Sequence, residues 1–367
     1  MKIDKQIVCG NIEVLEIDGD RVRLKNELRD TRLDRDWFYW AFRVTGAAGR
    51  TVTFEFPHEN RVGYWGAAVS HDQINWKWTG TRKVSVLEDG TPLESFTYTF
   101  GKDENETYFA QNMVYVPARF ESFCAANGLK IEELCVSNKG RSVPFVRFGS
   151  GEKKILLTSR HHACESTGTH VMESVFQSLI DNPIEGYEVV CVPFVDYDGV
   201  VDGDQGKHRL PHDHNRDYPF DEGESLYNTC DAIRRYVNGN SVLFAFDFHS
   251  PKHLGGINDK VSIIYNFENK APYLKRFTEF LHSRITKDSL SYDPVNDVPP
   301  NTEWNVDTNE DFARYLARKP ENRIACSVET PYFGEEDASN VVNGDSMREL
   351  GKCFARAVRD YIQEIDG

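Results

Sequence analysis

Two histidines and a glutamate, His161, His162 and Glu165, follow the apolar run KKILLT and precede THVMESVFQSLI, whose apolar residues have helical spacing. A buried strand would end just before them and a helix would begin just after them. His162 and Glu165 are three residues apart, so a single turn places both side chains on one face. The pair can ligate a metal ion. It can also belong to an ordinary turn, with Glu165 complementing the positive end of the helix.

Two further apolar runs end in residues of the same chemical types. LFAFDF leads into Asp247 and His249, and IACSV leads into Glu329. Ligands of open α/β sheets bind at the carboxyl ends of the strands, so these side chains would meet at one edge. A catalytic zinc takes three protein ligands, and His₂Glu is one such set. We therefore predict that His162, Glu165 and His249 bind one zinc ion per chain.

Glu329 follows an otherwise apolar strand, where a carboxylate needs an explanation. It is either a contact with a loop or helix end, or a general base beside a zinc-bound water.

A long polar segment, VDYDGVVDGDQGKHRLPHDHNRDYPFDEGES, follows the strand-like run YEVVCVPFV. Loops of this length in compact domains are usually functional or disordered. Asn215 and Arg216 place an amide beside a guanidinium within it. Because arginine binds a carboxylate through two parallel hydrogen bonds, the pair suits a substrate with a terminal carboxylate.

The same region offers rivals to the predicted zinc ligands. His161 would point away from His162, and we expect it to support the site or the fold. The stretch HDH, with His212 and His214, also has spacing that binds zinc. It ranks lower because no strand directly precedes it.

The pattern of apolar and polar residues changes along the chain, which predicts two domains. Residues 1–117 alternate apolar and polar residues in RVRLK, TVTFEF and SFTYTF, which predicts an all-β sandwich of short antiparallel strands whose last strand Pro117 closes. ARFESFCAAN would form a linking helix. Residues 118–367 alternate strand-like and helix-like runs, which predicts an α/β domain with a mixed, mainly parallel sheet and helices on both faces.

Composition excludes some functions. The net charge of −15 over 367 residues disfavours nucleic-acid binding. No window reaches the ~20 apolar residues that a membrane helix needs. The N-terminus has no hydrophobic signal core, so we expect a cytoplasmic protein without a membrane partner. The eight cysteines form no CxxC pair and are expected to be buried rather than to form disulfides or bind zinc.

The motifs taken together resemble the zinc carboxypeptidases, and especially their cytosolic branch. HACE resembles the family's HxxE zinc pair, DFHS its later zinc histidine, DHNRDY its Asn–Arg pair and SVETPYFG the segment with its general base. The aromatic-rich DWFYWAFRV resembles the β domain that precedes the catalytic domain in the cytosolic branch. The likeness covers most of the chain.

The resemblance assigns zinc to His162, Glu165 and His249, and proton transfer to Glu329. It assigns the substrate's C-terminal carboxylate to Asn215 and Arg216.

Three further roles of the family transfer less directly. The arginine that stabilises the oxyanion corresponds to Lys207 or Arg209, and we favour Arg209 because of its planar fork. The mobile tyrosine corresponds to Tyr292 or Tyr315, between which spacing does not choose. Asp311, in NEDFARY, would line the specificity pocket.

The predicted function is that of a zinc metallocarboxypeptidase, a hydrolase that acts on the C-terminal peptide bond of peptides or proteins. Two alternatives stay open: a zinc amidohydrolase that deacylates N-acyl amino acids, and a non-catalytic module that binds C-termini. The preferred C-terminal residue, the choice among peptide, protein and cell-wall substrates, and the oligomeric state are open as well. The N-terminal domain is expected to pack on the catalytic one.

Overall fold

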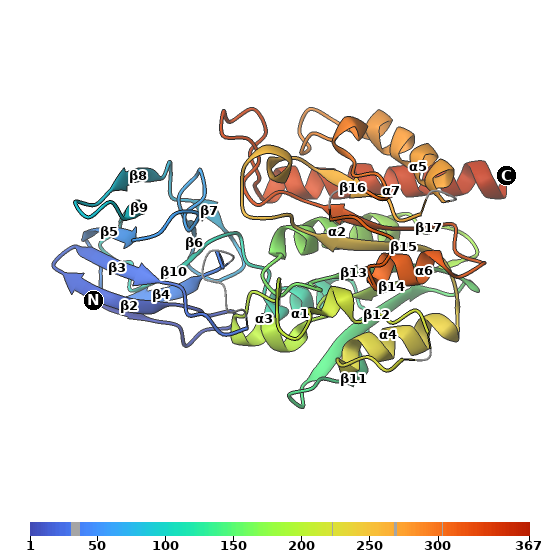
Figure 1. Cartoon of the computed structure of the whole chain (residues 1–367), viewed down its shortest axis with the longest axis horizontal. Helices are drawn as coiled ribbons and strands as arrows, with labels where there is room; N and C mark the ends of the chain where they lie inside the picture. The colour runs from blue at the N-terminus through green and yellow to red at the C-terminus, as the bar shows by residue number, and fades with distance from the viewer. Residues whose placement is uncertain (31–36, 222, 268–269, 303) are drawn as a thin grey trace.

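The computed structural model describes residues 1–30, 37–221, 223–267, 270–302 and 304–367. Figure 1 shows an all-β region that holds the N-terminus beside an α/β region that holds the C-terminus. The predicted order of a β domain followed by an α/β domain is therefore confirmed.

The N-terminal region consists of two five-stranded sheets. One has the order β1 (Lys2–Asp4), β4 (Ala41–Thr45), β10 (Glu106–Ala110), β6 (Ala68–Ser70) and β7 (Lys77–Trp78). The other has the order β2 (Glu13–Asp18), β3 (Arg21–Lys25), β5 (Thr51–Phe56), β9 (Pro92–Thr99) and β8 (Lys83–Val86). Neighbouring strands are antiparallel except β3 and β5, which are parallel.

Alternation along the strands builds the core of this sandwich. Val22 and Leu24 of β3 and Phe54 of β5 are fully buried, whereas Arg21, Arg23, Lys25 and Thr53 beside them are exposed or only partly buried. Their side chains pack with aromatic rings from β4 and β10, such as Phe42 and Phe109, in one apolar cluster. Period-two patterning thus predicted this half of the fold correctly.

The link between the domains differs from the prediction at Pro117. The last strand, β10, ends at Ala110, and the helix α1 (Pro117–Ala126) begins at Pro117 itself. The prediction that Pro117 closes a strand is wrong, because proline suits the first helical position, where no N–H bond is needed. The linking helix is confirmed, and a domain boundary at residue 117 stays a prediction.

The C-terminal region is built on one seven-stranded sheet. Its order is β11 (Glu132–Val136), β12 (Ser142–Gly149), β14 (Tyr187–Val192), β13 (Lys153–Ser159), β15 (Ser241–His249), β17 (Ile324–Glu329) and β16 (Ser262–Ile264). The four strands from β14 to β17 are mutually parallel, and antiparallel strands flank them on both sides. The sheet is therefore mixed with a parallel centre, as predicted.

Helices cover both faces of this sheet. On β13, Ile155 and Leu157 pack in the cluster that holds α2 (Ser166–Asp181), α5 (Ala271–Arg284) and α7 (Gly344–Asp366). Leu156 packs in the cluster on the other face with α4 (Asn228–Asn238) and α6 (Phe312–Ala317). The remaining helical elements are α3 (Tyr197–Asp202), η2 (His214–Arg216), η3 (Gly256–Asp259) and η4 (Pro294–Asn296).

The two domains pack together through aromatic side chains, in line with the expectation. Trp65 Nε1 donates to the backbone oxygen of Phe333 at 3.0 Å, and Trp78 Nε1 donates to that of Val342 at 2.7 Å. Tyr64 and Phe333 belong to one buried cluster that spans both domains. A Cβ atom on Gly63 would lie 2.1 Å from the Phe333 ring, so glycine is required for this close approach.

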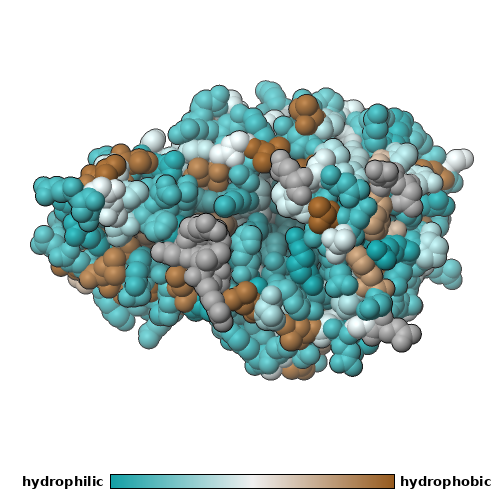
Figure 2. All heavy atoms as spheres, viewed as in Figure 1, coloured by the Kyte–Doolittle hydropathy of each residue, from teal (hydrophilic) through white to brown (hydrophobic). Residues whose placement is uncertain are grey.

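The face of the molecule seen in Figure 2 is mainly polar. Figure 2 shows hydrophilic residues over most of the visible face, with apolar residues in small separate groups. None of the described helices is long and apolar enough to cross a membrane. The cysteines, from Cys9 to Cys353, are all free, and all but Cys135 are buried.

Candidate active site

Three neighbouring parallel strands deliver the predicted side chains to one edge of the sheet. Ser159, the last residue of β13, pairs with Phe248 of β15, and His249 pairs with Glu329 at the end of β17. The HHACE turn that follows β13 therefore begins beside His249. The structure brings His162, Glu165, His249 and Glu329 into one region.

The three predicted zinc ligands form a compact buried cluster. His162 Nδ1 lies 2.8 Å from Glu165 Oε1, and His249 Nδ1 lies 2.8 Å from Glu165 Oε2. One ligand atom from each residue lies within 4.8 Å of the other two, without any rearrangement. The donor set, two imidazoles and a carboxylate, is one that catalytic zinc uses.

The turn that carries His162 and Glu165 is fixed by a buried arginine. Arg160 has a left-handed backbone, with φ +62°, and its Nε donates to the backbone oxygen of Ala163 at 2.6 Å. Glu165 occupies the N-cap position of α2, yet its side chain makes no capping hydrogen bond and faces the imidazoles instead. The alternative in which Glu165 only complements the helix end does not describe this geometry.

Electrostatics keeps the cluster charged. Burial alone would raise the pKa of Glu165, but His162, Lys207 and His249 lower it well below its usual value. Burial would lower the pKa values of the two histidines, but Glu165 and nearby aspartates raise both. An ionised carboxylate lies between two imidazoles here. A divalent cation that bound to these three groups would displace the protons of the imidazoles.

A second buried layer supports His249. Asp247 Oδ2 lies 2.5 Å from His249 Nε2, while Asp247 Oδ1 accepts from Thr158 Oγ1 at 2.8 Å and lies 2.8 Å from His161 Nδ1. His161 Nε2 lies 2.8 Å from the Tyr218 hydroxyl. His161 therefore supports the site, as expected. The set of His161, Asp247 and His249 also has metal-binding proximity, but these hydrogen bonds account for it.

Glu329 and Lys207 complete the cluster. Glu329 Oε2 is buried and has no hydrogen-bond partner among the described residues. Burial raises the pKa of Glu329, against the opposing effect of His249 and Lys207. Lys207 Nζ lies 2.6 Å from Glu165 Oε1 and donates to the backbone oxygen of Ser250 at 2.9 Å. A cation and an unpaired carboxyl oxygen thus face the same ligand set.

The Asn–Arg pair lies on the next segment of chain. Asn215 Nδ2 lies 3.4 Å from His249 Nε2, and Asn215 Oδ1 accepts from the backbone N–H of Phe312 at 3.2 Å. Arg216 Nη1 donates to the backbone oxygen of Asn215 at 2.8 Å. Asp213 Oδ1 lies 3.5 Å from His162 Nε2, so the same short helix reaches both histidines of the cluster.

Arg209, which we favoured for the oxyanion, is engaged elsewhere. Its guanidinium lies 2.8 Å from Asp196, 3.0 Å from Asp30 and 3.3 Å from Asp204. Of the two cations that the sequence left open, Lys207 is the one in contact with the predicted ligands. The preference for Arg209 therefore needs correction, since three carboxylates already hold its planar fork.

The remaining sequence candidates have structural partners of their own. Tyr292 donates its hydroxyl to Asp297 at 2.8 Å, and Tyr315 donates to Asn238 at 2.8 Å. Asp311 caps α6 by accepting from the Arg314 backbone at 2.8 Å, and it pairs with the Arg314 side chain. These hydrogen bonds and this ion pair tie the three side chains to residues outside the cluster of predicted ligands.

The two histidines of the alternative HDH zinc pair also have separate partners. His212 Nε2 lies 2.9 Å from Asp217 Oδ1, while the His214 ring stacks on Tyr227 at 3.6 Å between centroids. The two histidines serve different contacts and do not share an ion site in the part of the chain that the structure describes.

Sequence reasoning missed the support that Asp247 and Tyr218 give. Asp247 carried a signal: residues i and i+2 of a strand face the same side, so Asp247 had to lie on the side of His249. Tyr218 carried none, because it follows a short irregular segment without periodicity.

Comparisons with known proteins identify what the chain resembles as a whole. Residues 3–111 match the family model of the cytosolic carboxypeptidase N-terminal domain. Over its full length the chain is 24% identical to the uncharacterized protein ZMO1242 of Zymomonas mobilis, and covers 97% of it. It is also 24% identical to cytosolic carboxypeptidase 2 of Macaca fascicularis, over 67% of the chain but only 34% of that longer protein.

Solved structures resemble the whole chain. A metallo-carboxypeptidase from Burkholderia cenocepacia matches with a TM-score of 0.77 at 19% identity, over 99% of both chains. One from Pseudomonas aeruginosa, in complex with (2-guanidinoethylmercapto)succinic acid, matches with a TM-score of 0.74 at 18% identity over 100% of both. The chain has the metallo-carboxypeptidase fold, preceded by a region that matches the model of the cytosolic carboxypeptidase N-terminal domain. The predicted resemblance is confirmed.

Proposed function

We propose that the protein is a zinc-dependent metallocarboxypeptidase, which removes the C-terminal residue of a peptide or protein. The observation that carries the proposal is the convergence of His162, Glu165 and His249 beside the buried, unpartnered Oε2 of Glu329. The fold and the family of the N-terminal domain support it independently.

His162, Glu165 and His249 would hold the ion, through the two Nδ1 atoms and the carboxylate that already face one another. Zinc in such a site supplies Lewis acidity, which activates water and polarises a carbonyl at neutral pH. Asp247 holds the far nitrogen of His249 and Asp213 lies near that of His162, and carboxylates in these positions orient metal-binding histidines.

Glu329 would act as the general base. Its unpartnered oxygen can accept a proton from the attacking water and then pass that proton to the leaving amine. The raised pKa of Glu329 suits this exchange, because a catalytic carboxyl group works best when its pKa approaches the operating pH.

Lys207 would stabilise the oxyanion in place of Arg209. Its ammonium lies beside the predicted ligand Glu165, and a preorganised cation in a buried site can stabilise the negative charge that develops on the substrate oxygen. Asn215 and Arg216 would bind the terminal carboxylate of the substrate, which makes the activity that of an exopeptidase.

The test uses the purified protein, metal analysis and a panel of peptides that differ only in a free or amidated C-terminus. We expect bound zinc, release of single C-terminal amino acids from free peptides, and only a small residual rate on amidated ones. Glu329→Gln should reduce kcat by about 10²-fold or more with unchanged zinc content. Activity that survives this substitution, or equal cleavage of amidated peptides, would refute the proposal.

N-acyl amino acids in the same panel test the amidohydrolase alternative, since they should be hydrolysed poorly. Peptide binding without turnover at full zinc occupancy would favour a non-catalytic module. A cytoplasmic location and the absence of nucleic-acid and membrane partners stay predictions from the sequence.

A further inference from the structure

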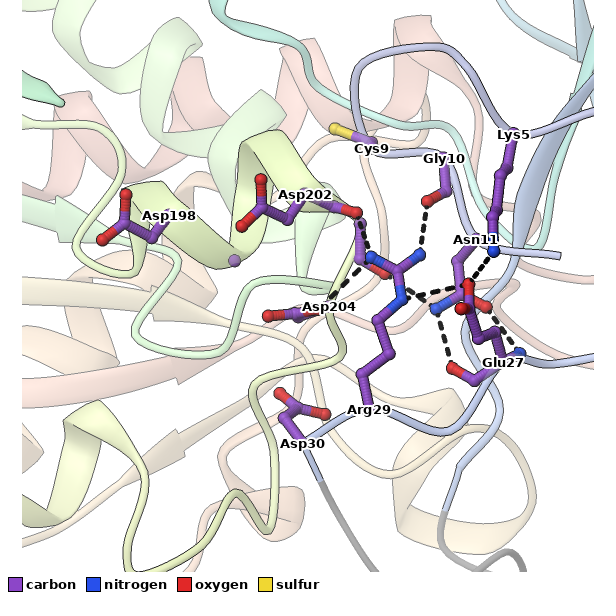
Figure 3. A network of polar contacts seen from close by, with 12 residues as sticks. Lys5, Cys9, Gly10, Asn11, Glu27, Arg29, Asp30, Asp198, Asp202 and Asp204 are labelled. Atoms are coloured by element: carbon purple, nitrogen blue, oxygen red, sulfur yellow. Dashed lines mark hydrogen bonds and ion pairs between the residues drawn. The ribbon is translucent and has the colours of Figure 1, made fainter. Parts of the chain in front are cut away.

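The segment 201–210, which carries Lys207, lies between the two domains. Figure 3 shows Arg29 of the N-terminal domain with Asp202 and Asp204 on one side and Gly10, Asn11 and Glu27 on the other. The segment contains several backbone groups that accept or donate across the domain boundary. It therefore connects the sandwich to the candidate active site.

Side chains of the N-terminal domain bind the end of α3. Arg29 Nη1 donates to the backbone oxygen of Asp202 at 2.5 Å, while its Nη2 donates to that of Gly10 at 2.8 Å. The fully buried Asn11 donates from Nδ2 to the backbone oxygen of Gly203 at 3.0 Å. Gly203 has φ +81°, and a Cβ there would lie 2.3 Å from the oxygen of Gly10, so the two backbones touch.

Asp30 binds the residue before Lys207. Its Oδ2 accepts from the backbone N–H of Gly206 at 2.8 Å and from Arg209 Nε at 3.0 Å. Its backbone oxygen accepts from the N–H of Leu210 at 3.2 Å. These bonds hold the chain on both sides of Lys207.

On its other side the segment touches the turn that carries the predicted ligands. The Gln205 backbone oxygen accepts from the N–H of Cys164 at 3.0 Å. A Cβ on Gly206 would lie 3.0 Å from the Cα of His162 and 2.4 Å from the nitrogen of Ala163. Gly206 packs directly against the backbone of this turn. A shift of Gly206 would therefore move Lys207 relative to Glu165.

We propose that the N-terminal domain positions Lys207 for catalysis, with Asn11 and Asp30 as the positioning residues. Adhesion between the domains does not require these contacts, because the aromatic cluster around Phe333 buries apolar area at a separate place. Directional hydrogen bonds between Asp30 and the backbone N–H groups of Gly206 and Leu210, one on each side of Lys207, instead fix where its side chain begins. The bond from Asn11 to Gly203 anchors the chain ahead of them. The activity arm of the test below rests on the proposed function, and the exchange arm does not.

The test compares Asp30→Ala and Asn11→Ala with Lys5→Ala in the full chain loaded with zinc. Lys5 is a matched control, because it belongs to the same network but pairs with Glu27 inside the N-terminal domain. We expect Asp30→Ala to lower kcat by about tenfold with a smaller change in KM, since small misplacements of catalytic groups are costly. Lys5→Ala should leave both constants unchanged.

A double-mutant cycle tests whether Asp30 affects activity through Lys207. If Asp30 acts through Lys207, Asp30→Ala combined with Lys207→Met should lose no more activity than Lys207→Met alone. Amide hydrogen exchange of residues 203–209 should become at least several-fold faster in Asp30→Ala and Asn11→Ala, at unchanged zinc content. Asp30→Asn, which keeps an oxygen acceptor for Gly206, should restore most of the protection and activity.

Two results would overturn the inference. One is additive loss in the double variant, which would mean that Asp30 acts independently of Lys207. The other is unchanged exchange in both Asp30→Ala and Asn11→Ala. If Asp30→Ala fails to fold, Asn11→Ala, alone and combined with Lys207→Met, carries the same test. Faster exchange in a protein that hydrolyses no peptide would leave the positioning intact and refute the proposed function instead.

Discussion

Asp247 Oδ2 lies 2.5 Å from His249 Nε2, and this contact decides which nitrogen of His249 faces the other predicted ligands. With Nε2 bound to the carboxylate, Nδ1 points at Glu165 Oε2 across 2.8 Å. The other carboxylate oxygen is held by Thr158 and His161, so Asp247 cannot turn away. Such a partner fixes both the tautomer and the orientation of a metal-binding imidazole.

Replacement of Asp247 should therefore weaken zinc binding. Asp247→Ala is expected to raise the zinc Kd about 10- to 100-fold, the usual effect of losing such a partner. Competition with a chromophoric chelator measures this without any substrate. Thr158→Val is the control, because it removes only one bond to Asp247 and should have a smaller effect. An unchanged Kd for Asp247→Ala would show that the carboxylate does not orient His249.

Replacing Lys207 with methionine should mainly reduce activity, whereas replacing Arg209 with methionine should mainly reduce stability. Lys207→Met is expected to lower kcat/KM by about 10²-fold in zinc-loaded protein, with little change in Tm. Arg209→Met leaves Asp30, Asp196 and Asp204 without their shared cation, and should lower stability by about 3 kcal/mol. Denaturant unfolding and peptide kinetics measure the two effects. The opposite pattern would return the oxyanion role to Arg209.

Arg216 should determine the recognition of the terminal carboxylate. Arg216→Ala is expected to reduce kcat/KM for free peptides about 10- to 100-fold, mainly through KM, because a hydrogen bond to a charged group contributes roughly 1.5–3 kcal/mol. The small residual rate on amidated peptides should not change. If both substrates lose activity equally, Arg216 serves the structure of η2 rather than the substrate.

Asp297 should make stability depend on pH away from the active site. Burial raises the pKa of Asp297 to about 7 from 3.8, although bonds from Ile263 and Tyr292 lower it. Between these values the unfolded chain releases the proton while the folded protein keeps it, so stability contributed by this group falls as pH rises. Below pH about 4 both states are protonated and the effect vanishes.

Asp297→Asn should remove this dependence. Relative to the original protein, its free energy of unfolding should increase from pH 4 to pH 8 by on the order of 4 kcal/mol. Urea unfolding at a series of pH values measures the change. Asp288→Asn, which removes a carboxyl group at an exposed position, is the comparison variant. A constant difference across the range would place the pKa of Asp297 near its usual value.

The sequence predicted the ligand cluster because its members end apolar runs. His162 and His249 stand at the ends of strands that turn out to be neighbours, and parallel neighbours bring their carboxyl ends together. Glu329 could be found by the same reasoning, since β17 is the next strand of the sheet. Only the neighbour relationship had to be assumed, and it required no knowledge of side-chain conformation.

The choice between Lys207 and Arg209 could not be predicted in this way. They lie two residues apart in an irregular segment without periodicity. Which cation reaches Glu165 depends on Asp30 and Asp196, which come from distant parts of the chain. The prediction at Pro117 is wrong for a related reason: the residues before it resemble a strand in sequence, but no strand within the described ranges pairs with them.

The ring of Phe333 seated over Gly63 has a consequence for the protein as a whole. Aromatic residues of both domains lie in one buried cluster. If either domain unfolded, apolar side chains of the other would therefore be exposed to water. Heating should then give a single calorimetric endotherm, with matching van't Hoff and calorimetric enthalpies. A catalytic half expressed alone would present a bare aromatic surface to water and self-associate, so the two halves are inseparable parts of one cooperative unit.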